Sequence, residues 1–103
     1  MVIYNKAIRD KIPEIIKESG KNCNVKKLDN SEFLIRLEKK LVEELEEYQE
    51  SKNVEELADI LEVIYRISKL KGVVSDELDE IRQKKAEQRG KFDDNLFLVD
   101  SDK

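Results

Sequence analysis

The 103-residue sequence contains no histidine and a single cysteine, Cys23. One cysteine cannot form a disulfide within its own chain. Without histidine, the usual zinc, haem and histidine-base chemistries are excluded. Any catalysis must therefore rest on carboxylates, lysines, arginines or tyrosines, or on a metal ion held by oxygen atoms.

Long hydrophobic runs are also absent. The longest unbroken run, Leu96 to Val99, is far shorter than the roughly 20 residues that span a membrane. No apolar stretch near Met1 has the length of a signal peptide. We therefore expect a cytoplasmic protein with no membrane partner.

Net charge is small although charged residues are abundant. They make up 43% of the chain, but 20 Lys and Arg nearly balance 24 Asp and Glu, which leaves a net charge of -4. A nucleic-acid-binding protein would carry a basic excess, so we expect no nucleic-acid partner. Leu, Ile, Val and Phe make up 32 of the 103 residues, well above the roughly 20% below which chains stay disordered. The chain should fold as one domain, residues 1–103, with a thin core that a second copy would help to stabilise.

Glycine and proline are few, and they mark the ends of the expected helices. Pro13 and Gly20 bound a short helix over 13–19. Neither residue type interrupts 31–50, which predicts a long helix with Asn30 or Ser31 as its N-cap.

Two further helices follow. Asn53 is the expected N-cap of a helix that reaches about residue 71, and Ser75 that of a helix ending near Arg89. The 22–29 segment reads as a loop or a short strand, and 92–99 as a short strand or a docking arm. We predict an all-α antiparallel helical bundle with at most a short β accessory from these two segments.

Acidic residues lie where apolar residues belong on two of these helices. At about 100° per residue, Glu44 projects inside the apolar arc of the 31–50 helix, with Glu47 beside it at the edge. Glu56 projects inside the apolar arc of the next helix, and Asp59 flanks it. If the two helices form a hairpin, the four carboxylates meet in one groove. That much negative charge requires a cation, and oxygen ligands favour Mg²⁺ or Mn²⁺, which usually bind together with substrate phosphates.

Two simpler interpretations stay open at this point. Glu56 lies three residues after the expected N-cap, where it could complete a capping box. Glu44 and Glu47 could instead pair with Lys40 and Lys39 on a solvated helix surface.

The acidic residues also form a motif. The segments EELEE at 43–47 and ELAD at 56–59 resemble the EExxE and ExxD signature of MazG-like, all-α nucleoside triphosphate pyrophosphohydrolases. The opening YNKAIRDKIP at 4–13 is similar to that of the phosphoribosyl-ATP pyrophosphohydrolase-like branch, and KAEQRGKF at 85–92 is similar to its usual ending. The resemblance covers nearly the whole chain.

The resemblance implies Mg²⁺-dependent hydrolysis between the α and β phosphates, which gives a nucleoside monophosphate and pyrophosphate and often clears non-standard nucleotides. The implied metal ligands are Glu44, Glu47, Glu56 and Asp59. The metal ion would lower the pKa of the attacking water, or Glu44 or Glu47 would instead act as the catalytic base that deprotonates it. Basic side chains suited to bind the polyphosphate of the substrate are Lys6, Arg9, Lys11, Lys85 and Arg89.

Two alternative functions follow from the same features. The substrate could be phosphoribosyl-ATP in histidine biosynthesis. The chain could also be a non-catalytic helical dimerisation module, whose inward acids pair with basic residues of a partner. The thin core and the family both imply a homo-oligomer, either a dimer or a tetramer.

Overall fold

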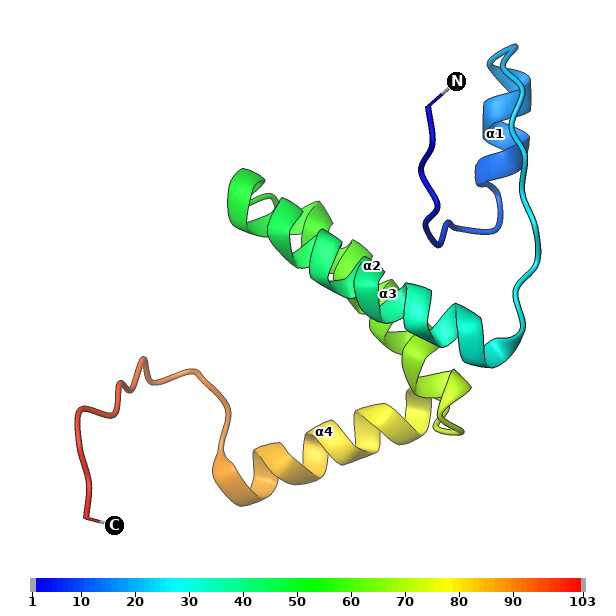
Figure 1. Ribbon diagram of the computed structural model, residues 1–103. Coiled ribbons are helices and arrows are strands. Elements are labelled where there is room, and N and C mark those ends of the chain that lie inside the picture. The colour runs from blue at the N-terminus through cyan, green and yellow to red at the C-terminus, as the bar shows by residue number, and fades with distance from the viewer. Residues whose placement is uncertain (1, 103) are drawn as a thin grey trace.

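The computed structural model describes residues 2–102, and its regular structure is entirely helical (Figure 1). The helices are α1 (Ile12–Glu18), α2 (Asn30–Ser51), α3 (Val54–Leu70) and α4 (Ser75–Arg89). The all-α prediction is confirmed. The short β accessory does not form, because the 22–29 and 92–99 segments are irregular and have no neighbouring strand with which to pair.

Helices α2 and α3 form a closely packed hairpin, and two residues connect them. Lys52 adopts the left-handed conformation (φ 58°), and its N–H donates to the carbonyl oxygen of Tyr48 at 2.7 Å. Asn53 then begins α3 as its N-cap, because its side chain accepts a hydrogen bond from the N–H of Glu55 at 3.1 Å. The predicted antiparallel hairpin and its cap are therefore confirmed.

Two other predicted caps are wrong. The N-cap of α2 is Asp29, not Asn30 or Ser31, since its carboxylate accepts from the N–H of Glu32 at 2.9 Å. This hydrogen bond and a second from the Ser31 hydroxyl lower the pKa of Asp29. Ser75 is the first helical residue of α4 and not its cap, because the extended N-cap position falls on the preceding valine. Neighbouring polar residues can each serve as a cap, and only the backbone path selects between them.

The fourth helix leaves the hairpin. α4 packs against α3 near their junction and then points away, and the residues after Gly90 extend further still (Figure 1). Among the described residues, none of the helices has both the length and the apolarity that crossing a membrane requires.

The single chain buries little apolar surface. Within residues 2–102 only two apolar residues, Ala7 and Leu37, are buried, each with 6% of its surface exposed. Leu45, Leu57 and Leu61 lie on apolar helix faces and are still 48%, 46% and 45% exposed. The radius of gyration is 17.9 Å, whereas a compact chain of this length has about 13 Å. The apolar faces of the helices are therefore only partly covered within one chain.

The cap at Asn53 fixes where α3 begins and should be measurable. We expect Asn53→Ala to lower the free energy of unfolding by about 1 kcal/mol, because the N–H of Glu55 loses its acceptor. For a domain of this size the melting temperature should fall by roughly 4–8 °C, as followed by circular dichroism. The control Asn24→Ala, in an irregular segment, should leave it unchanged. Equal melting temperatures for Asn53→Ala and the wild type would contradict the assigned cap.

Candidate metal centre

Three carboxylates from the two hairpin helices converge. Glu44 of α2 and Glu56 and Asp59 of α3 each offer an oxygen atom, and these three atoms lie within 4.8 Å of one another. Glu44 is buried, and the other two are half-buried. The packing of α2 on α3 thus brings together three acidic side chains. Helical periodicity predicted each of them on or beside an apolar face.

Glu44 is the buried member of the group. Only 7% of its surface is exposed, and its Oε2 atom is buried with no hydrogen-bond partner. Its Oε1 atom lies 3.3 Å from Nζ of Lys40, one turn earlier in α2. A buried acceptor without a partner lowers stability by about 1–3 kcal/mol. A hydrogen-bond donor or a cation bound to this oxygen would remove that cost.

The surroundings of Glu44 alter its acidity. Burial raises the pKa of its carboxyl above the usual value, the Lys40 ammonium opposes that rise, and the negative charge of Glu47 adds to it. The ionised form of Glu44 is therefore disfavoured in this position in the absence of a cation.

Neither of the two simpler interpretations accounts for all of the acids. In a capping box, Glu56 would accept from the N–H of Asn53, but that N–H donates to Oγ of Ser51 at 3.1 Å. Glu56 therefore does not cap the helix, and its carboxylate lies close to those of Glu44 and Asp59. The pairing of Glu44 with Lys40 does form, yet it leaves Oε2 of Glu44 without a partner.

The remaining two acids of the EExxE motif lie beside the group. Glu47 is exposed and is not one of the three converging carboxylates, although its charge reaches Glu44. Glu43 is half-buried, and its Oε1 atom lies 3.2 Å from Nζ of Lys6 and 3.8 Å from Nζ of Lys40.

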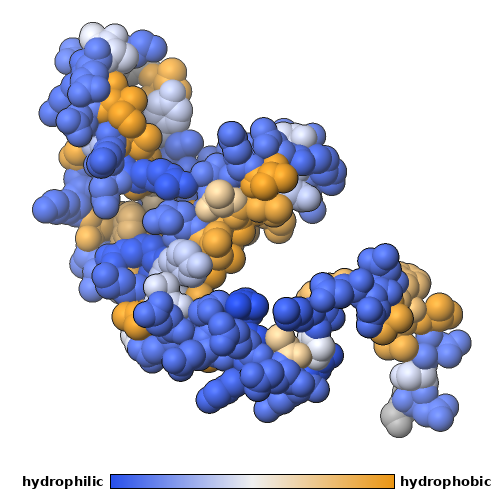
Figure 2. Space-filling model, turned by 180° about the vertical axis from the view of Figure 1, so that it is seen from behind, coloured by the Kyte–Doolittle hydropathy of each residue, from blue (hydrophilic) through white to orange (hydrophobic). Residues whose placement is uncertain are grey.

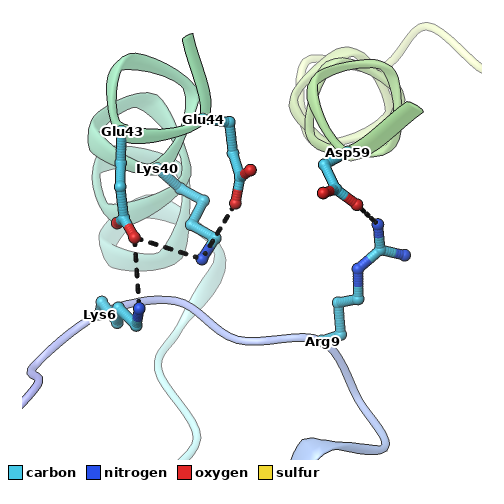
Figure 3. A network of polar contacts seen from close by, with 6 residues as sticks. All are labelled: Lys6, Arg9, Lys40, Glu43, Glu44 and Asp59. Carbon is cyan, nitrogen blue, oxygen red and sulfur yellow. Dashed lines mark hydrogen bonds and ion pairs between the residues drawn. The ribbon is translucent and has the colours of Figure 1, made fainter. Parts of the chain in front are cut away.

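The N-terminal segment brings two cations to the acids. Figure 3 shows Lys6 and Arg9 reaching from this segment towards the carboxylates of α2 and α3. Arg9 donates to Oδ1 of Asp59 at 2.7 Å. Ala7, between the two cations in sequence, is buried and anchors the segment. Sequence reasoning identified both cations but did not anticipate that each would pair with an acid of the motif.

The local charges do not balance. Lys6, Lys40 and Arg9 are paired with Glu43, Glu44 and Asp59. Among the described residues, neither Glu47 nor Glu56 takes part in an ion pair, so the five acids of the motif meet three cations. A divalent cation would supply the missing positive charge.

The other predicted phosphate-binding residues lie elsewhere. Lys11 is exposed at the start of α1 and forms no ion pair within the part of the chain that is described. Lys85 and Arg89 are exposed on the C-terminal half of α4, which is carried away from the hairpin (Figure 1). The fold of one chain therefore brings Lys6 and Arg9 to the acids and leaves the other three apart.

Comparison with protein-family models, with curated proteins and with solved structures finds no match to this chain. The family resemblance therefore rests on the motifs alone, and the chemistry of the site must be argued from its own residues. Three oxygen ligands, an unpaired buried carboxylate oxygen and two nearby cations are suited to hold a hard divalent ion and an anionic phosphate.

The buried acid should cost stability when no cation is bound. Because the pKa of Glu44 is raised by folding, its cost is absent at a pH below the usual glutamate value and develops as the pH rises through the raised value. We expect Glu44→Gln to raise the melting temperature in EDTA at pH 7, with a smaller gain near pH 4. The new amide can donate to the adjacent carboxylates, which removes the repulsion.

The matched control is Glu46→Gln, an exposed position on the same helix. It should change the melting temperature little at either pH. If Glu44→Gln lowered the melting temperature at pH 7 in EDTA, the ion pair with Lys40 would outweigh the cost of burial, and the assigned imbalance would be wrong.

Proposed function

We propose that this chain is a Mg²⁺-dependent nucleoside triphosphate pyrophosphohydrolase. It cleaves between the α and β phosphates and releases a nucleoside monophosphate and pyrophosphate, and it thereby clears non-standard nucleotides in the cytoplasm. The observation that carries the proposal is the convergence of three carboxylates around the unpaired Oε2 of Glu44. The resemblance of the EExxE and ExxD motifs also supports it, because the three converging carboxylates belong to these motifs.

The donor set fits Mg²⁺ or Mn²⁺. All the available ligands are carboxylate oxygens, which hard divalent ions prefer, and the orphaned oxygen of Glu44 has no protein partner. We assign Glu44, Glu56 and Asp59 as the residues that hold the ion. When bound, Mg²⁺ would neutralise charge on the phosphates and lower the pKa of a coordinated water.

We assign to Glu47 the role of accepting a proton from the attacking water. It is exposed and stands outside the three converging acids, whereas Glu44 is already shared with Lys40. Because Glu44 is assigned to the ion, Glu47 is the acid of the EExxE motif that we assign to this role.

Arg9 and Lys6 would bind the polyphosphate. Both are paired with acids of the motif, and a cation that neutralises Asp59 would release Arg9. A guanidinium can then take two phosphate oxygens at once, and an ammonium supplies a second positive charge. Lys6 and Arg9 would thus exchange their carboxylate partners for phosphate oxygens when the substrate binds.

Lys11, Lys85 and Arg89 would complete the substrate site in a homo-oligomer. A chain of this mass normally exposes about 6,000 Å², but this one exposes 9616 Å². A standard interface covers about 800 Å² on each partner, less than a quarter of this excess, so the chain has ample surface with which to form a dimer or tetramer. In such an assembly the distant cations of α4 could serve the site of a neighbouring copy.

A non-catalytic dimerisation module is the second candidate. It is favoured by the pairing of Lys6 and Arg9 with the acids, because ion pairs of this kind could also hold an assembly together without a metal. The two candidates differ in their response to Mg²⁺.

Removal of one metal ligand should abolish turnover. We expect Glu56→Gln and Asp59→Asn each to reduce pyrophosphate release from nucleoside triphosphates in Mg²⁺ by about 10²–10³-fold. The control Glu62→Gln, an exposed acid on the same helix, should retain full activity. The assay should use a panel of standard and modified nucleotides and phosphoribosyl-ATP, so that substrate class is tested at the same time. Unchanged pyrophosphate release in both variants would refute the metal site.

Mg²⁺ should also stabilise the fold. With Mg²⁺ and a nucleoside triphosphate at 100 times the dissociation constant, we expect the free energy of unfolding to rise by roughly 2.7 kcal/mol. The melting temperature should therefore increase over that in EDTA, and the Glu56→Gln variant should lack the increase. A wild-type protein that Mg²⁺ and nucleotide leave unaltered would favour the dimerisation module instead.

A further inference from the structure

The C-terminal arm, residues 92–99, is an apolar segment without a partner in its own chain. Its five large apolar side chains are almost fully exposed: Phe92 (99%), Leu96 (90%), Phe97 (88%), Leu98 (79%) and Val99 (83%). Four of the five are consecutive, and they form an unbroken apolar run. Exposing a contiguous apolar run of this length in water is unfavourable, which marks it as an interaction segment.

A second apolar surface is also uncovered. A groove of about 380 Å³ lies where α3 meets α4, and we call it the α3–α4 groove. Figure 2 shows hydrophobic atoms along the hairpin on the side of α4, and again on the arm. The lining residues are mostly aliphatic, and they are Leu41, Ile64, Ile67, Ser68, Lys71, Val73, Leu78 and Ile81.

The charges of the arm and the groove are complementary. The apolar run of the arm is preceded by Asp93 and Asp94 and followed by Asp100 and Asp102. The groove lining contains one charged residue, Lys71, and no acid. An acidic-flanked apolar segment can therefore enter the groove without facing a like charge, and Lys71 can pair with one of its flanks.

The direction of the arm favours a second copy over the same chain. The groove contacts α4 at Leu78 and Ile81, about 12–17 Å along the axis from the end of α4 at Arg89. Beyond Gly90 the arm first turns to the side of α4 on which the hairpin lies and then runs outward past the end of α4, so it does not fold back along α4 (Figure 1). To reach its own groove the arm would have to reverse its direction, whereas a second copy can present its groove without any such reversal.

The exposed area also fits an exchange between copies. The chain exposes roughly 3,600 Å² more than a folded chain of its mass, several times the share of one partner in a standard interface. In a two-fold symmetric pair each arm would fill the groove of the other copy, so the pair would bury two arms and two grooves.

We propose that the C-terminal arm of one copy docks in the α3–α4 groove of a second copy, and that the exchange is reciprocal. The proposal names the surfaces that hold together the homo-oligomer proposed above. It does not depend on the metal centre, so loss of nucleotide hydrolysis and loss of the arm contact can be told apart.

The first test is the mass of the assembly in solution, measured by light scattering after gel filtration. The full-length chain should be a dimer or a larger even assembly. The variant Leu96→Ser, Phe97→Ser, Leu98→Ser should show at least a tenfold weaker association. The control variant Val2→Ser, Ile3→Ser removes exposed apolar residues from the other end and should associate like the wild type. A monomeric wild type, or a triple variant that associates as tightly as the wild type, would overturn the proposal.

The second test determines which groove the arm occupies. In a Cys23→Ser background, Leu98→Cys is introduced in one chain and Ile81→Cys in a second chain of different tag length. After mixing and oxidation in a glutathione buffer, we expect a covalent product that contains one chain of each length. An internal disulfide in a chain with both substitutions, together with no mixed product, would place the arm in its own groove and overturn the exchange. An assembly that persists without either crosslink would retain the homo-oligomer and refute the arm contact.

Discussion

The two-residue connection between α2 and α3 is the constraint on which the rest of the structure depends. A turn this short forces two amphipathic helices to pack antiparallel, with positions equally distant from the turn beside each other. Glu44 lies about 12 Å before the turn along α2, and Asp59 about 9 Å after it along α3. Their convergence therefore follows from the length of the connection and not from any attraction between the acids, which repel one another.

That repulsion organises the surroundings of the hairpin. The ammonium of Lys40 approaches Glu44 from the same helix, and the N-terminal segment lies across the acids with Lys6 and Arg9 towards them. These cations reduce the negative charge but leave an oxygen of Glu44 unpaired. The same excess of negative charge thus explains both the position of the N-terminal segment and the proposed affinity for a divalent ion.

The thin core and the candidate site are connected. A hairpin with one helix beyond it cannot enclose its own apolar faces, so Leu45, Leu57 and Leu61 remain nearly half exposed. The α3–α4 groove and the C-terminal arm are further parts of this uncovered surface. These uncovered surfaces are the ones that the proposed exchange of arms between two copies would bury.

Periodicity and end signals in the sequence were sufficient to predict the helices, the Asn53 cap and the unusual placement of Glu44, because these depend on residues within one or two turns. The choice of Asp29 as the cap of α2, the failure of Glu56 to complete a capping box and the separation of Glu47 from the other acids depend on the backbone path and on side-chain reach. The pairing of Arg9 with Asp59 joins residues far apart in the chain. Only the packing of α2, α3 and the N-terminal segment could decide it, because local patterns contain no information about which distant charges meet.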